Sequence, residues 1–225
     1  MSAIRRVWIT RAEPGAGRTA ARLTARGFEP VVAPLLAIRP LTPEIDLTGV
    51  EALAFTSVNG VEAFAALSHD RARPVFTVGD ATAAAAHKAG FNDVRSASGD
   101  AGALARLIAG AGFPGLILAP GAAEPAADLP ALLAGEAMVR TLAVYEAVET
   151  DVPTPAGFDA VLVHSPRAAR ALAMHAWGMD DRIAVAISPA AAAPLEDLGL
   201  REIRIARAPT DAALIEGLGE PGRRV

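Results

Sequence analysis

The residues of this chain that could do chemistry lie where predicted strands turn into predicted helices. Four of these turns place a serine or a glycine directly in front of a helical segment, at Ser57, Gly79, Ser165 and Ser188. The first turn of a helix presents backbone N–H groups without intrahelical partners at the positive end of the helix dipole. Each turn therefore suits an anion such as a carboxylate or a phosphate, and the chain makes this kind of edge repeatedly.

Three other side chains are candidates for a role. Tyr145 is the only tyrosine and lies near the end of a long predicted strand, where a buried structural role and a functional role are both open. The four histidines fall on four different elements without metal-site spacing, and of these only His164, beside Ser165, is expected at a cleft. Asp80 is expected to cap the helix that follows it, because aspartate is strongly preferred at that position.

Composition and motifs exclude several classes of protein. The chain has no cysteine, which rules out disulfides, thiolate catalysis and cysteine-ligated metal sites. The net charge of −4 and the 4% of aromatic residues argue against nucleic-acid binding. No apolar run approaches about 18 residues, and the N-terminal apolar segment is too short for a signal peptide. We therefore expect a cytoplasmic protein without membrane contact.

Nucleotide and phosphoryl sites are also disfavoured. Residues 15–20 fit a dinucleotide fingerprint, but four residues separate them from the preceding strand, and the next strand lacks the acidic residue that would hold a ribose. The chain has no P-loop. A receiver-like signalling domain is disfavoured because no acidic cluster lies at the predicted strand ends to hold a magnesium ion.

Predicted strands and helices alternate along the whole chain, which indicates an α/β fold with parallel sheets and helices on both faces. Strands are expected at 7–10, 31–38, 52–56, 75–78, 92–94, 116–118, 138–148, 160–163, 183–187 and 203–206. Helices are expected at 17–26, 60–67, 81–89, 101–108 and 128–133, and from residues 166, 189 and 211.

The sequence also repeats itself. Segments 54–61, 76–83 and 100–105 resemble segments that follow them by 108 to 110 residues, and the opening segment 8–38 matches 116–148. Such near-constant offsets indicate a duplicated α/β half. Because each half has a long second strand ending at a proline-bearing connector, we expect two similar lobes joined by a two-strand linker, with a cleft between them. Lobe one would comprise 1–37 and 150–225, lobe two 43–143, and the linkers 38–42 and 144–149.

Four short segments, taken with their spacing, resemble the uroporphyrinogen-III synthase family: ITR at 9–11, FTSVNGVEAF at 55–64, VGDATAAAA at 78–86 and AVYEAV at 143–148. The resemblance covers essentially the whole chain and implies two α/β lobes joined by a pair of strands. It also implies a reaction that needs no cofactor or metal. In that reaction, linear hydroxymethylbilane loses its terminal hydroxyl and closes to uroporphyrinogen III with the last pyrrole inverted.

The resemblance implies Tyr145 as the catalytic hydrogen-bond or proton donor and a small-molecule substrate with eight carboxylates, acted on by a monomer. The expected substrate-binding residues are Arg11, Thr56, Ser57, Asn59, Gly79, Asp80, Thr82, His164, Ser165, Arg167 and Ser188. Two segments depart from the family pattern: 187–192 lacks the usual glycine and threonine, and 118–125 lacks the usual arginines. These losses leave open an alternative, a catalytically degenerate bilobed protein that binds a tetrapyrrole or has a regulatory role.

Overall fold

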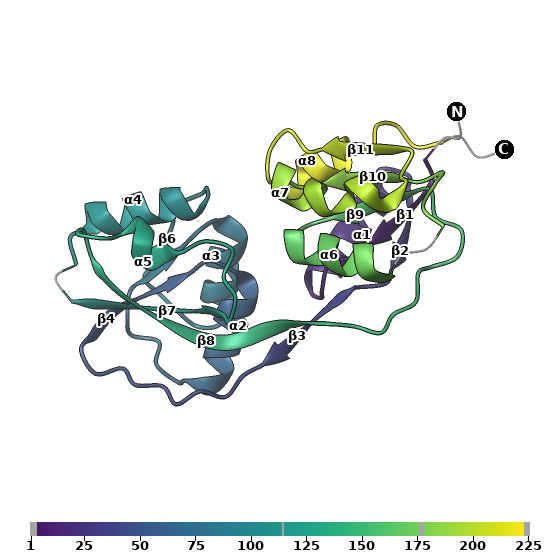
Figure 1. Cartoon of the computed structure of the whole chain (residues 1–225). Helices are drawn as coiled ribbons and strands as arrows, with labels where there is room; N and C mark the ends of the chain where they lie inside the picture. The colour runs from purple at the N-terminus through teal and green to yellow at the C-terminus, as the bar shows by residue number, and fades with distance from the viewer. Residues whose placement is uncertain (1–3, 114, 176–177, 223–225) are drawn as a thin grey trace. The chain divides into compact units, whose positions relative to one another are not determined.

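The computed structural model of the chain describes residues 4–113, 115–175 and 178–222. These residues form two compact units, each built around one sheet (Figure 1). Unit 1 contains the described residues up to Ala37 and from Val148 onward, and unit 2 runs from Ile38 to Ala147. No helix of the described residues is long and apolar enough to cross a membrane.

Unit 1 has a five-stranded parallel sheet in the order β11-β10-β9-β1-β2. The strands are β1 (Arg6–Ile9), β2 (Glu29–Val32), β9 (Ala160–Val163), β10 (Ile183–Ala186) and β11 (Glu202–Ile205). The helices are α1 (Gly15–Ala25), α6 (Pro166–His175), α7 (Pro189–Ala192), the 3-10 helix η1 (Ala193–Leu198) and α8 (Asp211–Glu216).

Successive side chains of the central strands of unit 1 point to opposite faces of the sheet. On one face Trp8 and Val161 share a core with α6, α7 and η1. On the other face Ile9 and Leu162 share a core with α1 and α8. Because both faces are covered, β9 and β10 are apolar and buried at every position, as expected for central parallel strands.

Unit 2 has a six-stranded sheet in the order β3-β8-β7-β4-β5-β6. The strands are β3 (Leu36–Pro40), β4 (Val50–Phe55), β5 (Val75–Thr77), β6 (Val94–Ser96), β7 (Leu116–Ala122) and β8 (Met138–Glu149). The helices are α2 (Val58–Leu67), α3 (Asp80–Lys88), α4 (Ala101–Ala111) and α5 (Leu129–Leu132).

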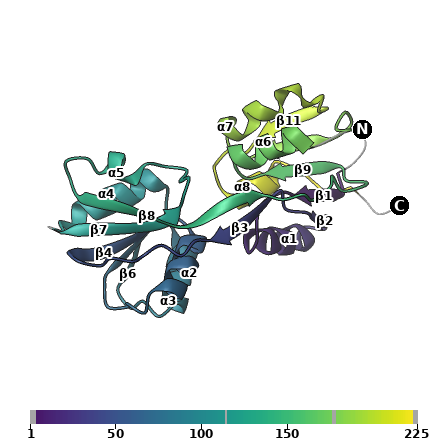
Figure 2. The ribbon, with the colours of Figure 1, turned by 60° about the horizontal axis from the view of Figure 1, so that its bottom comes forward.

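The two faces of the unit 2 sheet are also covered by different helices. Leu53 and Phe55 of β4 share a core with α2 and α3, whereas Ala52 and Ala54 share one with α4 and α5. Figure 2 shows these two pairs of helices on opposite sides of the sheet. The alternation along β4 therefore fixes which helices cover each face.

The strand orders of the two sheets match under the internal repeat. Strands β11, β10, β9, β1 and β2 of unit 1 correspond in order to β6, β5, β4, β7 and β8 of unit 2. The fold class predicted from the sequence, two similar α/β halves with parallel sheets flanked by helices, is confirmed.

The segment predicted as one strand at 31–38 is two strands in different sheets. β2 ends at Val32 and β3 begins at Leu36. The break contains Pro34, which has no N–H to donate to a strand ladder. Beyond it, the Thr150 N–H donates to the Leu35 carbonyl at 3.1 Å and the Leu41 N–H donates to the Val144 carbonyl at 2.9 Å. Segments 35–41 and 144–150 thus run side by side in opposite directions.

Two strands differ from their predicted bounds. β6 lies at Val94–Ser96 rather than at 92–94, because Asn92 and Asp93 are poor strand formers. β7 continues to Ala122, well beyond the predicted end at residue 118, because β8 pairs with it along its whole length. The pairing is long-range and leaves no local signal.

Candidate functional site

The residues named from the sequence fall into two groups, one in each unit, mostly near the carboxyl ends of the parallel strands. In unit 2 they are Thr56, Ser57, Asn59, Gly79, Asp80, Thr82 and Tyr145. In unit 1 they are Arg11, His164, Ser165, Arg167 and Ser188.

The Tyr145 hydroxyl lies beside the first turn of α2. Tyr145 is on β8, only 8% exposed, and its hydroxyl oxygen is 3.0 Å from the Ser57 Oγ. Ser57 is the N-cap of α2, and its Oγ accepts the Gly60 N–H at 3.0 Å. Because β7 lies between β8 and β4, this contact links the ends of two strands that are not neighbours in the sheet. Two residues 88 positions apart are thus joined at this edge.

A cavity of about 340 Å³ opens at the same edge of the unit 2 sheet. Its lining includes the exposed Thr56, the hydroxyl-bearing Thr141 and the end of β7 from Ala119 onward. Asp128 supplies the only charged side chain of this lining, and its Oδ1 caps α5 by accepting the Ala131 N–H at 3.1 Å. The residues of segment 118–125 that line this cavity, 119–123 and Pro125, are all small and uncharged.

Asp80 does not cap α3, contrary to the sequence prediction. Gly79 occupies the N-cap position with extended backbone and no side-chain cap, and Asp80 is the first helical residue. The Asp80 Oδ1 instead accepts hydrogen bonds from Ser96 and Ser98, both 2.7 Å away, which lower the pKa of the exposed Asp80 carboxyl. The Asp80 carboxylate therefore binds the Ser96 and Ser98 hydroxyls and does not accept a backbone N–H of α3. Thr82, two residues on, is buried.

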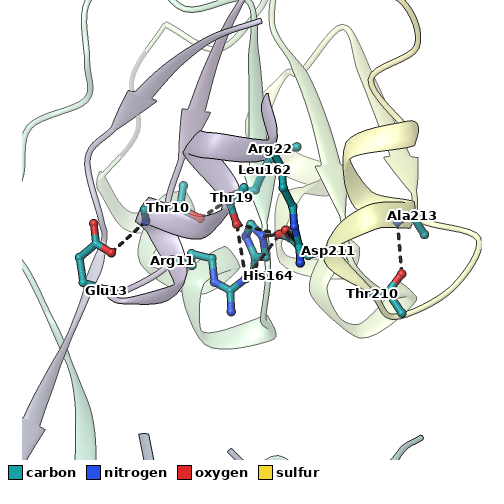
Figure 3. Close-up of polar contacts among 11 residues, drawn as sticks. Thr10, Arg11, Glu13, Thr19, Arg22, Leu162, His164, Thr210, Asp211 and Ala213 are labelled. Atoms are coloured by element: carbon teal, nitrogen blue, oxygen red, sulfur yellow. Dashed lines mark hydrogen bonds and ion pairs between the residues drawn. The ribbon is translucent and has the colours of Figure 1, made fainter. Parts of the chain in front are cut away.

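In unit 1, four side chains converge on Asp211 (Figure 3). The Asp211 Oδ1 accepts from Thr19 at 2.7 Å, from the His164 Nε2 at 2.9 Å and from Arg11 at 3.4 Å. Its Oδ2 accepts from Arg22 at 2.6 Å. The cluster joins residues that follow β1 and β9 to α1 and α8, so it links four elements of the unit. We call these five residues the Asp211 cluster.

Burial and hydrogen bonding set the charges within the Asp211 cluster. Burial alone would raise the pKa of Asp211, but hydrogen bonds from His164, Thr19 and Arg22 outweigh it and hold the pKa far below its ordinary value. Desolvation lowers the pKa of His164, whose side chain is 6% exposed, and also lowers that of Arg11. Since an ionised carboxylate only accepts, Nε2 carries the His164 proton. His164 Nδ1 is buried without a hydrogen-bond partner among the described residues.

The starts of α6 and α7 in unit 1 are capped by their own serines. The Ser165 Oγ accepts the Ala168 N–H at 3.1 Å, and the Ser188 Oγ accepts the Ala191 N–H at 3.3 Å. Each cap satisfies one of the free N–H groups of its helix. Arg167 is half-buried in the first turn of α6. These turns keep some free N–H groups for an anion, although fewer than an uncapped helix would offer.

The sequence analysis missed Asp211, Thr19 and Arg22. The repeat did mark the start of α8, because segment 210–215 resembles 100–105, but a helix start alone does not predict a buried carboxylate. No group of three or more acidic or histidine side chains suited to a metal ion occurs among the described residues.

Fold and site together define a duplicated two-unit α/β protein with polar helix starts at the sheet edges and a partly buried tyrosine–serine pair. The family model described as uroporphyrinogen-III synthase HemD matches residues 17–216. The chain belongs to the uroporphyrinogen-III synthase family. Members of this family are cofactor-independent lyases of tetrapyrrole biosynthesis, and they cyclise hydroxymethylbilane to uroporphyrinogen III with inversion of the terminal pyrrole.

Solved structures agree with this fold. The uroporphyrinogen-III synthetase from Helicobacter pylori matches with a TM-score of 0.66 and 17% identity, over 95% of this chain and 97% of that chain. A mutant uroporphyrinogen III synthase from Thermus thermophilus matches with a TM-score of 0.51 and 17% identity, over 95% and 96%. A search of curated protein sequences gave no match.

Proposed function

We propose that this chain performs the family's cyclisation with Tyr145 as the group that donates a proton to the departing hydroxyl. The observation that carries this proposal is the partly buried pair of Tyr145 and Ser57 hydroxyls, 3.0 Å apart at a helix start. Tyr145 is the chain's only tyrosine, and it lies within the AVYEAV segment that resembles the family.

The reaction requires few acid–base groups from the protein. The electron-rich pyrrole nitrogen expels the hydroxyl, and a donor lets it leave as water. A phenol is neutral at pH 7 and can donate its proton in that state. Ring closure on a pyrrole carbon releases a proton, so the phenol is restored and no net proton is consumed. The demanding part is to hold the linear substrate so that the inverted closure outpaces simple end-to-end closure.

We also propose that the helix starts bind the substrate's carboxylates. Free backbone N–H groups behind Ser57, Gly79, Ser165 and Ser188 are the donors, since helix N-termini favour anions. The Asp80 and His164 side chains support binding less directly, because each already has a partner within its unit. The full proposed set is Arg11, Thr56, Ser57, Asn59, Gly79, Asp80, Thr82, His164, Ser165, Arg167 and Ser188.

The finer assignments are a monomer that works in the cytoplasm. The absence of cysteine suits a reducing compartment. Size-exclusion chromatography with light scattering tests the monomer.

The function is tested by supplying purified protein with enzymatically generated hydroxymethylbilane. After oxidation, the uroporphyrin isomers are separated chromatographically and compared with a reaction that lacks the protein. We expect isomer III to dominate, with isomer I only as background. Isomer I alone in both reactions would refute the proposed function.

Replacing Tyr145 by phenylalanine tests the donor. We expect kcat to fall by about 100-fold, the lower end of the range for a lost general acid, because the pyrrole nitrogen still drives departure. The ring remains, so the free energy of unfolding should fall by only about 1 kcal/mol, the net value of one hydrogen bond. Turnover equal to wild type, measured on a sample whose unfolding curve shows it to be fully folded, would remove Tyr145 from this role.

A further inference from the structure

The Ser57 hydroxyl occupies a position between a backbone donor and the Tyr145 phenol. Its Oγ accepts the Gly60 N–H at 3.0 Å and lies 3.0 Å from the Tyr145 oxygen. A serine hydroxyl has one proton and two lone pairs. One lone pair is used by Gly60, so the contact with Tyr145 has only two arrangements. Either Tyr145 donates to Ser57, or Ser57 donates to Tyr145.

The two arrangements have opposite consequences for the phenol proton. If Tyr145 donates to Ser57, its proton points into the protein and is withheld from a substrate. If Ser57 donates to Tyr145, the phenol oxygen is an acceptor on that side and its own proton is directed elsewhere. Only the second arrangement leaves Tyr145 able to donate to a departing hydroxyl.

The helix start favours the second arrangement. A hydroxyl that accepts a hydrogen bond becomes a better donor, because bonds in a chain polarise one another. The chain Gly60 N–H to Ser57 Oγ–H to Tyr145 oxygen therefore strengthens each step in one direction. The positive end of the α2 dipole also stabilises negative charge on the phenol oxygen as its proton leaves.

We propose that Ser57 is a positioning residue that donates its proton to Tyr145 and thereby aims the phenol proton at the substrate. This inference rests on the proposed role of Tyr145 as proton donor. The Ser57 hydroxyl then acts through Tyr145, and the carboxylate proposed at this helix start contacts backbone N–H groups rather than that hydroxyl.

Three replacements of Ser57 separate proton donation from helix capping. Threonine keeps both the cap and a hydroxyl proton. Aspartate keeps the cap, since its oxygen can accept the Gly60 N–H, but an ionised carboxylate has no proton to donate. Alanine loses both. S57D is thus the informative variant. In its hydrogen bond with residue 57, Tyr145 can then only be the donor, so its proton is withheld from the substrate.

We expect S57T to keep kcat within about threefold of wild type, and S57D and S57A each to lose about 10- to 100-fold in kcat with KM changed by less than about threefold. S57D should unfold at the wild-type temperature, whereas S57A should be less stable. Full activity of S57D would overturn the proposal, and so would a loss in S57D that appears in KM rather than in kcat.

A double-mutant cycle with Tyr145→Phe distinguishes positioning from direct binding. If Ser57 acts only through the phenol, Ser57→Ala should cause no further loss of kcat in the phenylalanine background. If the kcat losses of the two single variants multiply in the double variant, Ser57 contacts the substrate itself and the proposal is overturned.

Two controls complete the experiment. The matched capping control is Asp100→Ala, which removes a cap of α4 in the same unit (Asp100 Oδ1 accepts the Ala103 N–H at 2.8 Å) and should leave kcat unchanged. Failure of the proposed function is recognised separately, because it would appear as wild-type protein that makes no isomer III or as an active Tyr145→Phe. The Ser57 variants are compared once wild type is shown to make isomer III and Tyr145→Phe is shown to have a lower kcat.

Discussion

Asp211→Asn removes the charge at the centre of the Asp211 cluster while keeping the size and shape of the side chain. In the wild type this carboxylate is 12% exposed and accepts from Thr19, His164, Arg22 and Arg11. An asparagine can keep one oxygen toward Thr19 and His164. Its amide nitrogen then faces the Arg22 guanidinium, which is also a donor.

The magnitude follows from these contacts. Hydrogen bonds to a charged acceptor contribute roughly 1 kcal/mol more than neutral ones, so the two short bonds from Thr19 and His164 lose about 2 kcal/mol together. The ion pair with Arg22, whose side chain is 57% exposed, adds at most about 1 kcal/mol. Removing a largely buried charge recovers part of this loss. We expect a net destabilisation of unit 1 of about 2 kcal/mol.

Urea unfolding followed by the fluorescence of Trp8, which is buried in unit 1, measures this change. The matched control is Glu216→Gln, which breaks the exposed α8 pair with Arg207 and should cost less than about 0.5 kcal/mol. Because the pKa of Asp211 is lowered by folding, its contribution is present above about pH 4 and shrinks as the pH falls further. An Asp211→Asn variant no less stable than the control at pH 7 would refute the reasoning.

Two other predictions concern His164 and Gly60. Folding lowers the pKa of His164, so the unfolded state binds more protons below about pH 6.5 and stability should fall as the pH falls, by at most about 1.4 kcal/mol per pH unit. His164→Gln should flatten the wild-type slope between pH 7 and 5 in pH-dependent urea titrations, and an unchanged slope would contradict this. A Cβ at Gly60 would lie 2.8 Å from the Pro120 carbonyl oxygen and 3.3 Å from the Ser57 Oγ. Gly60→Ala should therefore destabilise unit 2 by about 1–3 kcal/mol despite alanine's better helix propensity, whereas a more stable variant in thermal melts would show that the backbone yields freely.

Local patterns predicted most of the fold. Apolar runs located the buried strands, and the constant offset of the repeat predicted two similar sheets before their strand order was known. The split at Pro34 was missed because a proline within an apolar run is compatible with an edge strand. Asp80 was assigned to the wrong helix position because its partners, Ser96 and Ser98, come from the end of the next strand.

The candidate site was less accessible to sequence reasoning. Tyr145 could be singled out as the only tyrosine and by resemblance, but its contact with Ser57 spans 88 residues and has no local signature. Asp211 is an ordinary helix-start residue in sequence. Its importance comes from Thr19 and His164, which are 192 and 47 residues away along the chain. Long-range polar contacts of this kind become visible only when the strands are placed.

The discontinuity of unit 1 affects the order in which the chain can fold during its synthesis. Unit 2 is a single stretch, and the last of its strands, β8, has left the ribosome once residue 149 has emerged. β1 and α1 precede unit 2 in the chain, whereas their neighbour β9 and the covering helix α8 follow it. During synthesis β1 and α1 must therefore wait, without β9 and α8, while the unit inserted between them is completed.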